Sequence, residues 1–97
     1  MKPARFLLPA ELEMLEAARY YESQSPQLGV DLLEKVESAV RDVRQNPERW
    51  PVIRLDIRRR LVHRFPYAVL YRIATDEIVI VAVMHLHRRP DYWMDRI

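Results

Sequence analysis

The stretch Ile78–His85 reads IVIVAVMH and decides the fold, because seven consecutive apolar residues precede its closing histidine. A strand that is apolar at every position is typical of a central strand covered on both faces. The turn Thr75–Glu77 comes just before it, and another apolar stretch, Phe65–Ile73, precedes the turn. The two stretches therefore predict an antiparallel pair of strands. Pro66 has no backbone N–H to donate, which places it at a corner or an edge of the sheet.

A further strand is predicted upstream, over residues 53–65. Its odd positions are mostly apolar and its even positions are mostly arginine, so one face turns inward and an arginine-bearing face turns outward. Arg59 and His63 blur this alternation. The short apolar segment Arg5–Leu8 could add one more strand to the sheet.

Two amphipathic helices are predicted in the N-terminal half. Pro9 suits the first turn of the first helix, and apolar side chains then recur on one helical face. Ser25 would cap the second helix, Pro26 would open it, and Asn46-Pro47 would end it. We expect an α+β fold in which a helical hairpin, residues 9–46, packs on a small antiparallel sheet. The expected core includes Val36, Val40, Val69, Ile80 and Ala82, with Tyr20, Tyr21 and Trp50 as packing aromatics.

Composition limits the class of protein. The 97 residues predict one domain, residues 1–97, and the absence of cysteine rules out disulfides and thiolate metal sites. No apolar run approaches the ~20 residues of a membrane span, and no secretory signal is visible, so we expect a soluble, cytoplasmic protein. Residues 1–47 hold six basic and eight acidic side chains, whereas residues 48–97 hold ten arginines and six acids. The C-terminal half is therefore expected to meet an acidic partner.

The candidate binding residues follow from that charge. Arginine suits bidentate contact with phosphate or carboxylate, and a basic strip is predicted on the outward face of the upstream strand. Tyr92 and Trp93 could anchor a partner, or could fold back and cap the helical hairpin. Arg72 could pair locally with Asp76 or Glu77. The candidate arginines are Arg58, Arg60, Arg64, Arg88 and Arg89.

His85 is the one candidate for proton transfer, since histidine serves most often in that role near neutral pH. The alternative is a strand-end histidine that hydrogen-bonds a carbonyl or a partner. His85 and His87 share a strand face and could converge on a metal, but no third ligand of clear spacing follows them. No metal site and no cofactor are predicted.

Several short motifs follow one another along the chain: EAARYYE at 16–22, NPERWP at 46–51, RFPY at 64–67, YR at 71–72, AVMH at 82–85 and RPDYW at 89–93. Together with the order of strand, two helices and three antiparallel strands, this set resembles the RelE/ParE superfamily of bacterial toxins. The resemblance implies the toxin of a type II toxin–antitoxin pair, which an antitoxin holds inactive in a hetero-oligomer. An antitoxin tail is expected in a groove beside the helices and the sheet edge, with its acidic residues facing the arginines.

The superfamily divides by mechanism. RelE-type members cut messenger RNA on the ribosome, whereas ParE-type members poison DNA gyrase. Ribonuclease members commonly carry an arginine where Ala68 stands here, and one nuclease subgroup has a tyrosine at the position of Leu86. The chain therefore resembles ParE more closely, which implies that it binds gyrase. The alternatives are a ribosome-dependent endoribonuclease, with His85 and Arg64 as candidate catalytic residues, or a non-toxic binding homologue.

Overall fold

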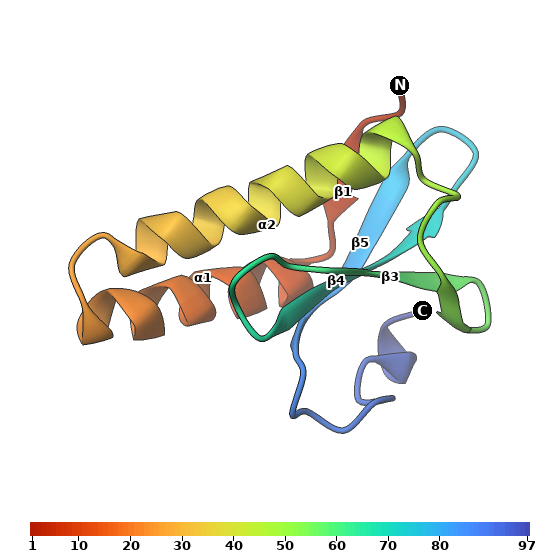
Figure 1. Ribbon diagram of the computed structural model, residues 1–97. Coiled ribbons are helices and arrows are strands. Elements are labelled where there is room, and N and C mark those ends of the chain that lie inside the picture. The colour runs from red at the N-terminus through yellow and green to blue at the C-terminus, as the bar shows by residue number, and fades with distance from the viewer.

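The central strand of the fold is β5 (Ile78–His85), in which every residue except the closing histidine is buried. The computed structural model describes residues 1–97 and contains a five-stranded sheet in the order β1-β5-β4-β3-β2 (Figure 1). The prediction of a central strand covered on both faces is therefore confirmed. The other strands are β1 (Ala4–Phe6), β2 (Val52–Arg54), β3 (Ile57–Leu61) and β4 (Tyr67–Ile73).

The sheet is mixed rather than wholly antiparallel. Strands β3, β4 and β5 pair antiparallel, as predicted, and β2 also pairs antiparallel with β3. Strand β1 lies parallel to β5, with Ala4 opposite Ile78. The pairing of β4 with β5 skips Val81, which forms a β-bulge. Because of the bulge, Val81 and Ala82 both pack on the face away from the helices.

The single strand predicted over residues 53–65 is wrong, because the chain turns back within it. A turn at Leu55-Asp56, where Leu55 has a left-handed φ of 53°, separates β2 from β3. Arg54 lies opposite Ile57 across this hairpin, so the two side chains share a face. At the turn, the odd-numbered and even-numbered side chains exchange faces of the sheet. The alternation in the sequence does not show this exchange, because it does not show where the chain turns.

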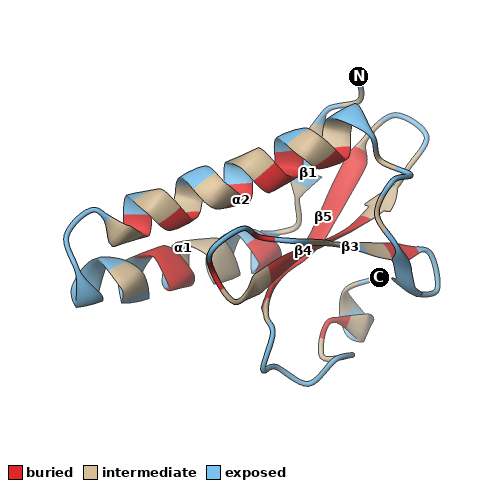
Figure 2. Cartoon of the chain, in the orientation of Figure 1, coloured by how far each residue is buried: buried red, intermediate tan, exposed pale blue.

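The helical hairpin is confirmed. Helices α1 (Leu8–Gln24) and α2 (Leu28–Gln45) pack together on one face of the sheet, with their buried residues turned toward each other and toward the strands (Figure 2). Val36, Val40, Val69, Ile80 and Ala82 are buried as predicted, although Ala82 packs on the opposite face. Tyr20 is 58% exposed, so its assignment to the core is wrong. Neither helix is long and apolar enough to cross a membrane.

The turn between the helices is capped differently from the prediction. Ser25 ends α1 instead of opening α2, and its side chain caps neither helix. The carboxylate of Glu22 accepts hydrogen bonds from the backbone N–H groups of Gln27 and Gly29, each at 3.0 Å. An acidic side chain at the end of α1 thus caps the start of α2, where the helix dipole favours a negative charge. Gly29 is buried beside α1, where the carbonyl oxygen of Ala18 leaves no room for a β-carbon.

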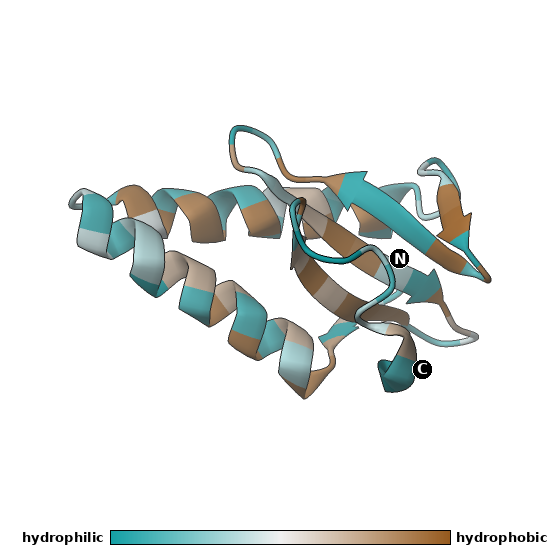
Figure 3. Ribbon diagram, turned by 90° about the horizontal axis from the view of Figure 1, so that it is seen from below, coloured by the Kyte–Doolittle hydropathy of each residue, from teal (hydrophilic) through white to brown (hydrophobic).

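The second face of the sheet is covered by the C-terminal tail, residues 86–97, which ends in the short 3₁₀ helix Met94–Arg96. Figure 3, seen from below, shows this polar tail crossing the apolar strands β4 and β5. Trp93 is fully buried there, and its indole N–H donates to the carbonyl of Pro90 at 2.8 Å. The tail therefore folds back, as one alternative predicted, but Trp93 packs on the sheet instead of the helical hairpin.

Candidate functional site

The tail is fixed to α1 through the carboxylate of Glu13. This group accepts hydrogen bonds from the Tyr92 hydroxyl at 2.7 Å and from both terminal nitrogens of Arg96 at 2.9 Å. Burial and the hydrogen bond to Glu13 raise the pKa of Tyr92 above its ordinary range, so its hydroxyl stays protonated. Hydrogen bonding to Glu13 likewise raises the pKa of Arg96. Tyr92 is thus half-buried and held in place.

Glu13 and Arg96 also cover the part of the β5 edge that has no neighbouring strand. Strand β1 ends at Phe6, so β5 has no neighbouring strand beyond Ile80 on that side. There Glu13 accepts from the N–H of Val83 at 3.1 Å, and Arg96 donates to the carbonyl of Val81 at 3.1 Å. Two side chains therefore satisfy backbone groups that a longer strand would otherwise pair.

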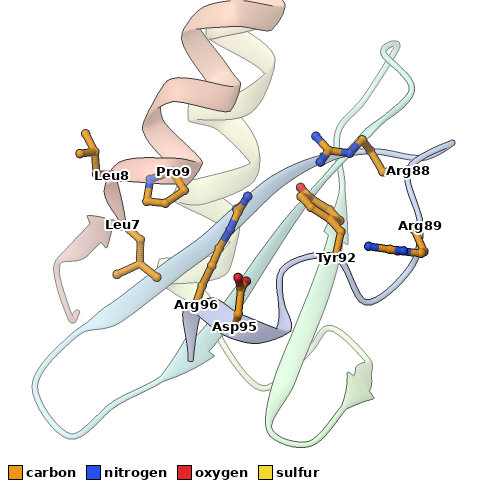
Figure 4. Close-up of a pocket in the computed structure, with 8 residues that line it drawn as sticks. All are labelled: Leu7, Leu8, Pro9, Arg88, Arg89, Tyr92, Asp95 and Arg96. Atoms are coloured by element: carbon orange, nitrogen blue, oxygen red, sulfur yellow. The ribbon is translucent and has the colours of Figure 1, made fainter.

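The tail arginines border a cavity of about 670 Å³ between the tail and the start of α1 (Figure 4). The Arg88 guanidinium lies 3.9 Å from the ring centroid of Tyr92, and Arg89 has 81% of its side chain exposed. Leu7 and Pro9 form the opposite wall. The structure thus brings three of the predicted binding residues together, namely Arg88, Arg89 and Tyr92.

The predicted position of the basic strip is wrong, because Arg58 and Arg60 of β3 face the helices. Arg58 lies opposite Tyr71 on the helix side and donates to the carbonyls of Glu48 and Trp50 at 3.0 and 2.7 Å. Arg60 forms an ion pair with Asp42 of α2 at 2.8 Å. Its guanidinium also lies 4.5 Å from the ring centroid of Trp50. Both side chains hold the segment before β2 in place and are largely occupied within the fold.

Arg64 and Arg72 also have internal partners. Arg64 lies 3.3 Å from the carboxylate of Asp31 in α2. Arg72 reaches Asp56 at 3.8 Å, so its predicted pairing with Asp76 or Glu77 is wrong. Glu77 instead receives hydrogen bonds from Arg5, which lower the pKa of that carboxyl.

His85 borders a separate cavity of about 290 Å³, beside Tyr67 of β4 and Arg88 of the tail. Its Nδ1 accepts a hydrogen bond from the backbone N–H of His87 at 3.1 Å, so the neutral ring carries its proton on Nε2. Arg64 does not border this cavity, and the structure does not assemble the two candidate catalytic residues around it. The rings of His85 and His87 lie 5.0 Å apart, with no third potential metal ligand beside them.

Sequence reasoning missed the role of Glu13 and the position of two free arginines. The helical spacing could have indicated that Glu13 turns inward, because it lies one turn from Ala10 and one turn from Ala17, and both of these residues are buried. No signal placed Arg54 and Arg59 on one face, since the turn between β2 and β3 was not predicted.

A solved structure of another protein shares this architecture. A solved structure described as the "Chromosomal ParDE TA system from P. aeruginosa" has the same fold, with a TM-score of 0.79 and 15% sequence identity. The match covers 90% of this chain and 98% of that chain. No curated protein matches the sequence significantly.

The family itself is identified by sequence. The model of the ParE toxin of type II toxin-antitoxin system, parDE, matches residues 5–90. The chain belongs to this family of toxins, as the resemblance to ParE implied.

Proposed function

We propose that this ParE-family toxin acts in the cytoplasm by binding DNA gyrase, and that a cognate antitoxin neutralises it. The observation that carries the binding mechanism is the arrangement of the tail. Arg88 and Arg89 keep 53% and 81% of their side chains exposed on a segment that Trp93 and Glu13 fix to the body of the protein. A fixed backbone that bears exposed guanidinium groups is suited to contact an acidic protein surface.

RNA cleavage has less support from the side chains present. Ala68 stands where ribonuclease relatives carry an arginine, and it is fully buried. His85 has no arginine of β3 or β4 at its cavity, and Leu86 replaces the tyrosine of one nuclease subgroup. A general acid–base pair with a cation for the phosphorane charge is therefore not assembled from the residues expected in that mechanism.

A supercoiling assay with purified gyrase tests the proposal. Arg88→Ala and Arg89→Ala should each weaken inhibition by about 0.5–3 kcal/mol of binding free energy, and His85→Ala should have a similar or smaller effect. Arg41→Ala is the matched control, because Arg41 is an exposed arginine on α2. Ribosome-dependent messenger RNA cleavage that disappears in His85→Ala would refute the binding mechanism. Activity in neither assay, with antitoxin binding retained, would indicate a non-toxic homologue.

The antitoxin is proposed to lie in the apolar groove on the outer side of the helical hairpin. Two adjoining hollows, of about 340 and 230 Å³, share Leu33 and are lined mostly by apolar side chains of both helices. Phe6 of the edge strand β1 borders the larger one. An amphipathic segment can bury apolar anchors in such a groove, and the solved ParDE system supports an antitoxin as the partner.

Calorimetry with the product of the neighbouring gene tests this site. Leu33→Asp and Leu15→Asp should weaken binding by at least about tenfold, because each places an unpaired charge against apolar antitoxin side chains. Leu61→Asp is the control, since Leu61 is 48% exposed on β3, away from the groove. Equal losses from all three variants would contradict the groove as the binding site. A complete lack of association would contradict the pairing itself.

A further inference from the structure

Most arginines in this protein have a partner within the fold. The guanidinium groups of eleven arginines make an ion pair, a hydrogen bond or a cation–π contact. Three arginines, Arg19, Arg54 and Arg59, make none of these contacts. A guanidinium presents five donors, so an unpartnered pair beside one cavity has the capacity to bind an oxyanion.

Two of these three arginines border the same cavity. Arg54 of β2 and Arg59 of β3 lie on the sheet face opposite the helices, around a hollow of about 370 Å³. Ile53 of β2, which is 37% exposed, contributes the accessible apolar part of its wall, beside the buried side chains of Met84 and Trp93. The cavity thus combines two free cations with an apolar surface.

The charge at this cavity fits one or two carboxylates. Asp91 is the single acidic residue in its wall, and the nearest cation to Asp91 is Arg89, at 4.0 Å. The two free guanidinium groups therefore leave a small positive excess. A nucleic acid strand requires a longer row of cations and exposed aromatic rings for stacking, whereas Trp93 is fully buried.

The surroundings of the cavity favour a protein as the source of those carboxylates. Val52 and Leu55, on the hairpin that carries Arg54, are 50% and 67% exposed. Strand β2 is the edge of the sheet, so one side of it has no neighbouring strand. An extended segment can pair with such an edge and direct alternate side chains to one face.

We propose that an acidic, extended segment of a partner protein binds along β2 and places a carboxylate between Arg54 and Arg59, with apolar neighbours against Val52 and Leu55. The segment alternates acidic and apolar residues, and its acidic side chains form bidentate hydrogen bonds with the arginines. This docking site is distinct from the tail arginines and from the helix groove. It does not depend on gyrase being the target of the toxin.

A peptide titration followed by NMR of the ¹⁵N-labelled full chain tests the proposal. The probe is a blocked hexapeptide of alternating valine and glutamate, and its counterpart has glutamine in place of glutamate. The glutamate peptide should shift the amide resonances of β2 and β3 and should bind about tenfold more tightly than the glutamine peptide.

Variants connect this binding to the two arginines. Arg54→Ala and Arg59→Ala should each weaken the glutamate peptide by about tenfold, whereas Arg19→Ala, the third unpartnered arginine, should change nothing. Unchanged thermal unfolding of each variant shows that the fold is intact. The proposal is overturned if the glutamate peptide leaves β2 unshifted, or if Arg19→Ala weakens it equally. A single-stranded RNA 12-mer that binds through Arg54 and Arg59, in place of the peptide, would identify a nucleic-acid site and would also overturn it.

Discussion

Replacing Glu13 by alanine is expected to be among the most destabilising changes to any charged residue of this protein. The substitution removes the acceptor for Val83, Tyr92 and Arg96 at once. The side chains of Glu13 and Arg96 are only 14% and 15% exposed, so solvent compensates little for the lost contacts. The remaining Arg96 would be a nearly buried cation without its carboxylate.

The expected cost follows from those burial values. Breaking a fully buried ion pair by removing one partner costs about 3–5 kcal/mol, and a little solvent access lowers this to about 2–4 kcal/mol. In a domain of this size, 1 kcal/mol corresponds to roughly 4–8 °C in Tm, so we expect Tm to fall by at least about 8 °C. Trypsin should also cleave more rapidly after Arg88, because the tail loses its attachment to α1.

Urea unfolding followed by tryptophan fluorescence measures this cost. The control is Glu16→Ala, one turn along α1, because Glu16 is exposed and makes no ion pair or side-chain hydrogen bond; that variant should stay within about 0.5 kcal/mol of the wild type. A double-mutant cycle with Arg96→Ala should give a coupling energy of about 1–3 kcal/mol. A cost below about 1 kcal/mol for Glu13→Ala, or additive effects of the two substitutions, would refute the reasoning.

Three further changes test the packing of the fold. Gly29→Ala should destabilise by about 1–3 kcal/mol in urea unfolding, because a β-carbon would overlap the carbonyl oxygen of Ala18; a stabilised variant would show that the helices can separate. Trp93→Ala should cost about 3–5 kcal/mol, since the side chain is fully buried, and a cost near zero would place the tail off the sheet. Tyr71→Phe should cost about 1 kcal/mol through loss of the 2.6 Å hydrogen bond to Pro47. Burial raises the pKa of Tyr71 to about 12, so its contribution to stability is complete below about pH 10 and is lost as the pH rises toward 12, which spectrophotometric titration of the phenol with parallel unfolding measurements would check.

Elements whose signal is local were predictable from the sequence. The all-apolar run of β5 and the helical periodicity of α1 and α2 depend on neighbours within a few residues, and each was predicted correctly. The turn at Leu55 was not predictable in this way, because it contains neither glycine nor proline. The cap on α2 was also not predicted, because the capping residue Glu22 lies in the preceding helix and reaches the start of α2 across the turn.

The candidate site was predicted only where chain position alone decided exposure. Arg88 and Arg89 follow the last strand, and both are exposed as expected. The predicted orientation of Arg58 and Arg60 was wrong. It depends on which face of the sheet the helices cover, and a single sequence does not contain that information. Arg59, which the alternation placed inward, is exposed on the other face.

The parallel pairing of β1 with β5 has a consequence for the order in which the toxin acquires its shape. During synthesis the helical hairpin emerges before β4 and β5, which form the surface that it covers. Ala4 can pair with Ile78, and Glu13 with Arg96, only after the later residue of each pair has been made. These contacts therefore close loops that span most of the chain. Long-range pairing of this kind slows folding. Each new molecule therefore passes through an interval in which the helical hairpin has been made but the sheet that it covers is incomplete.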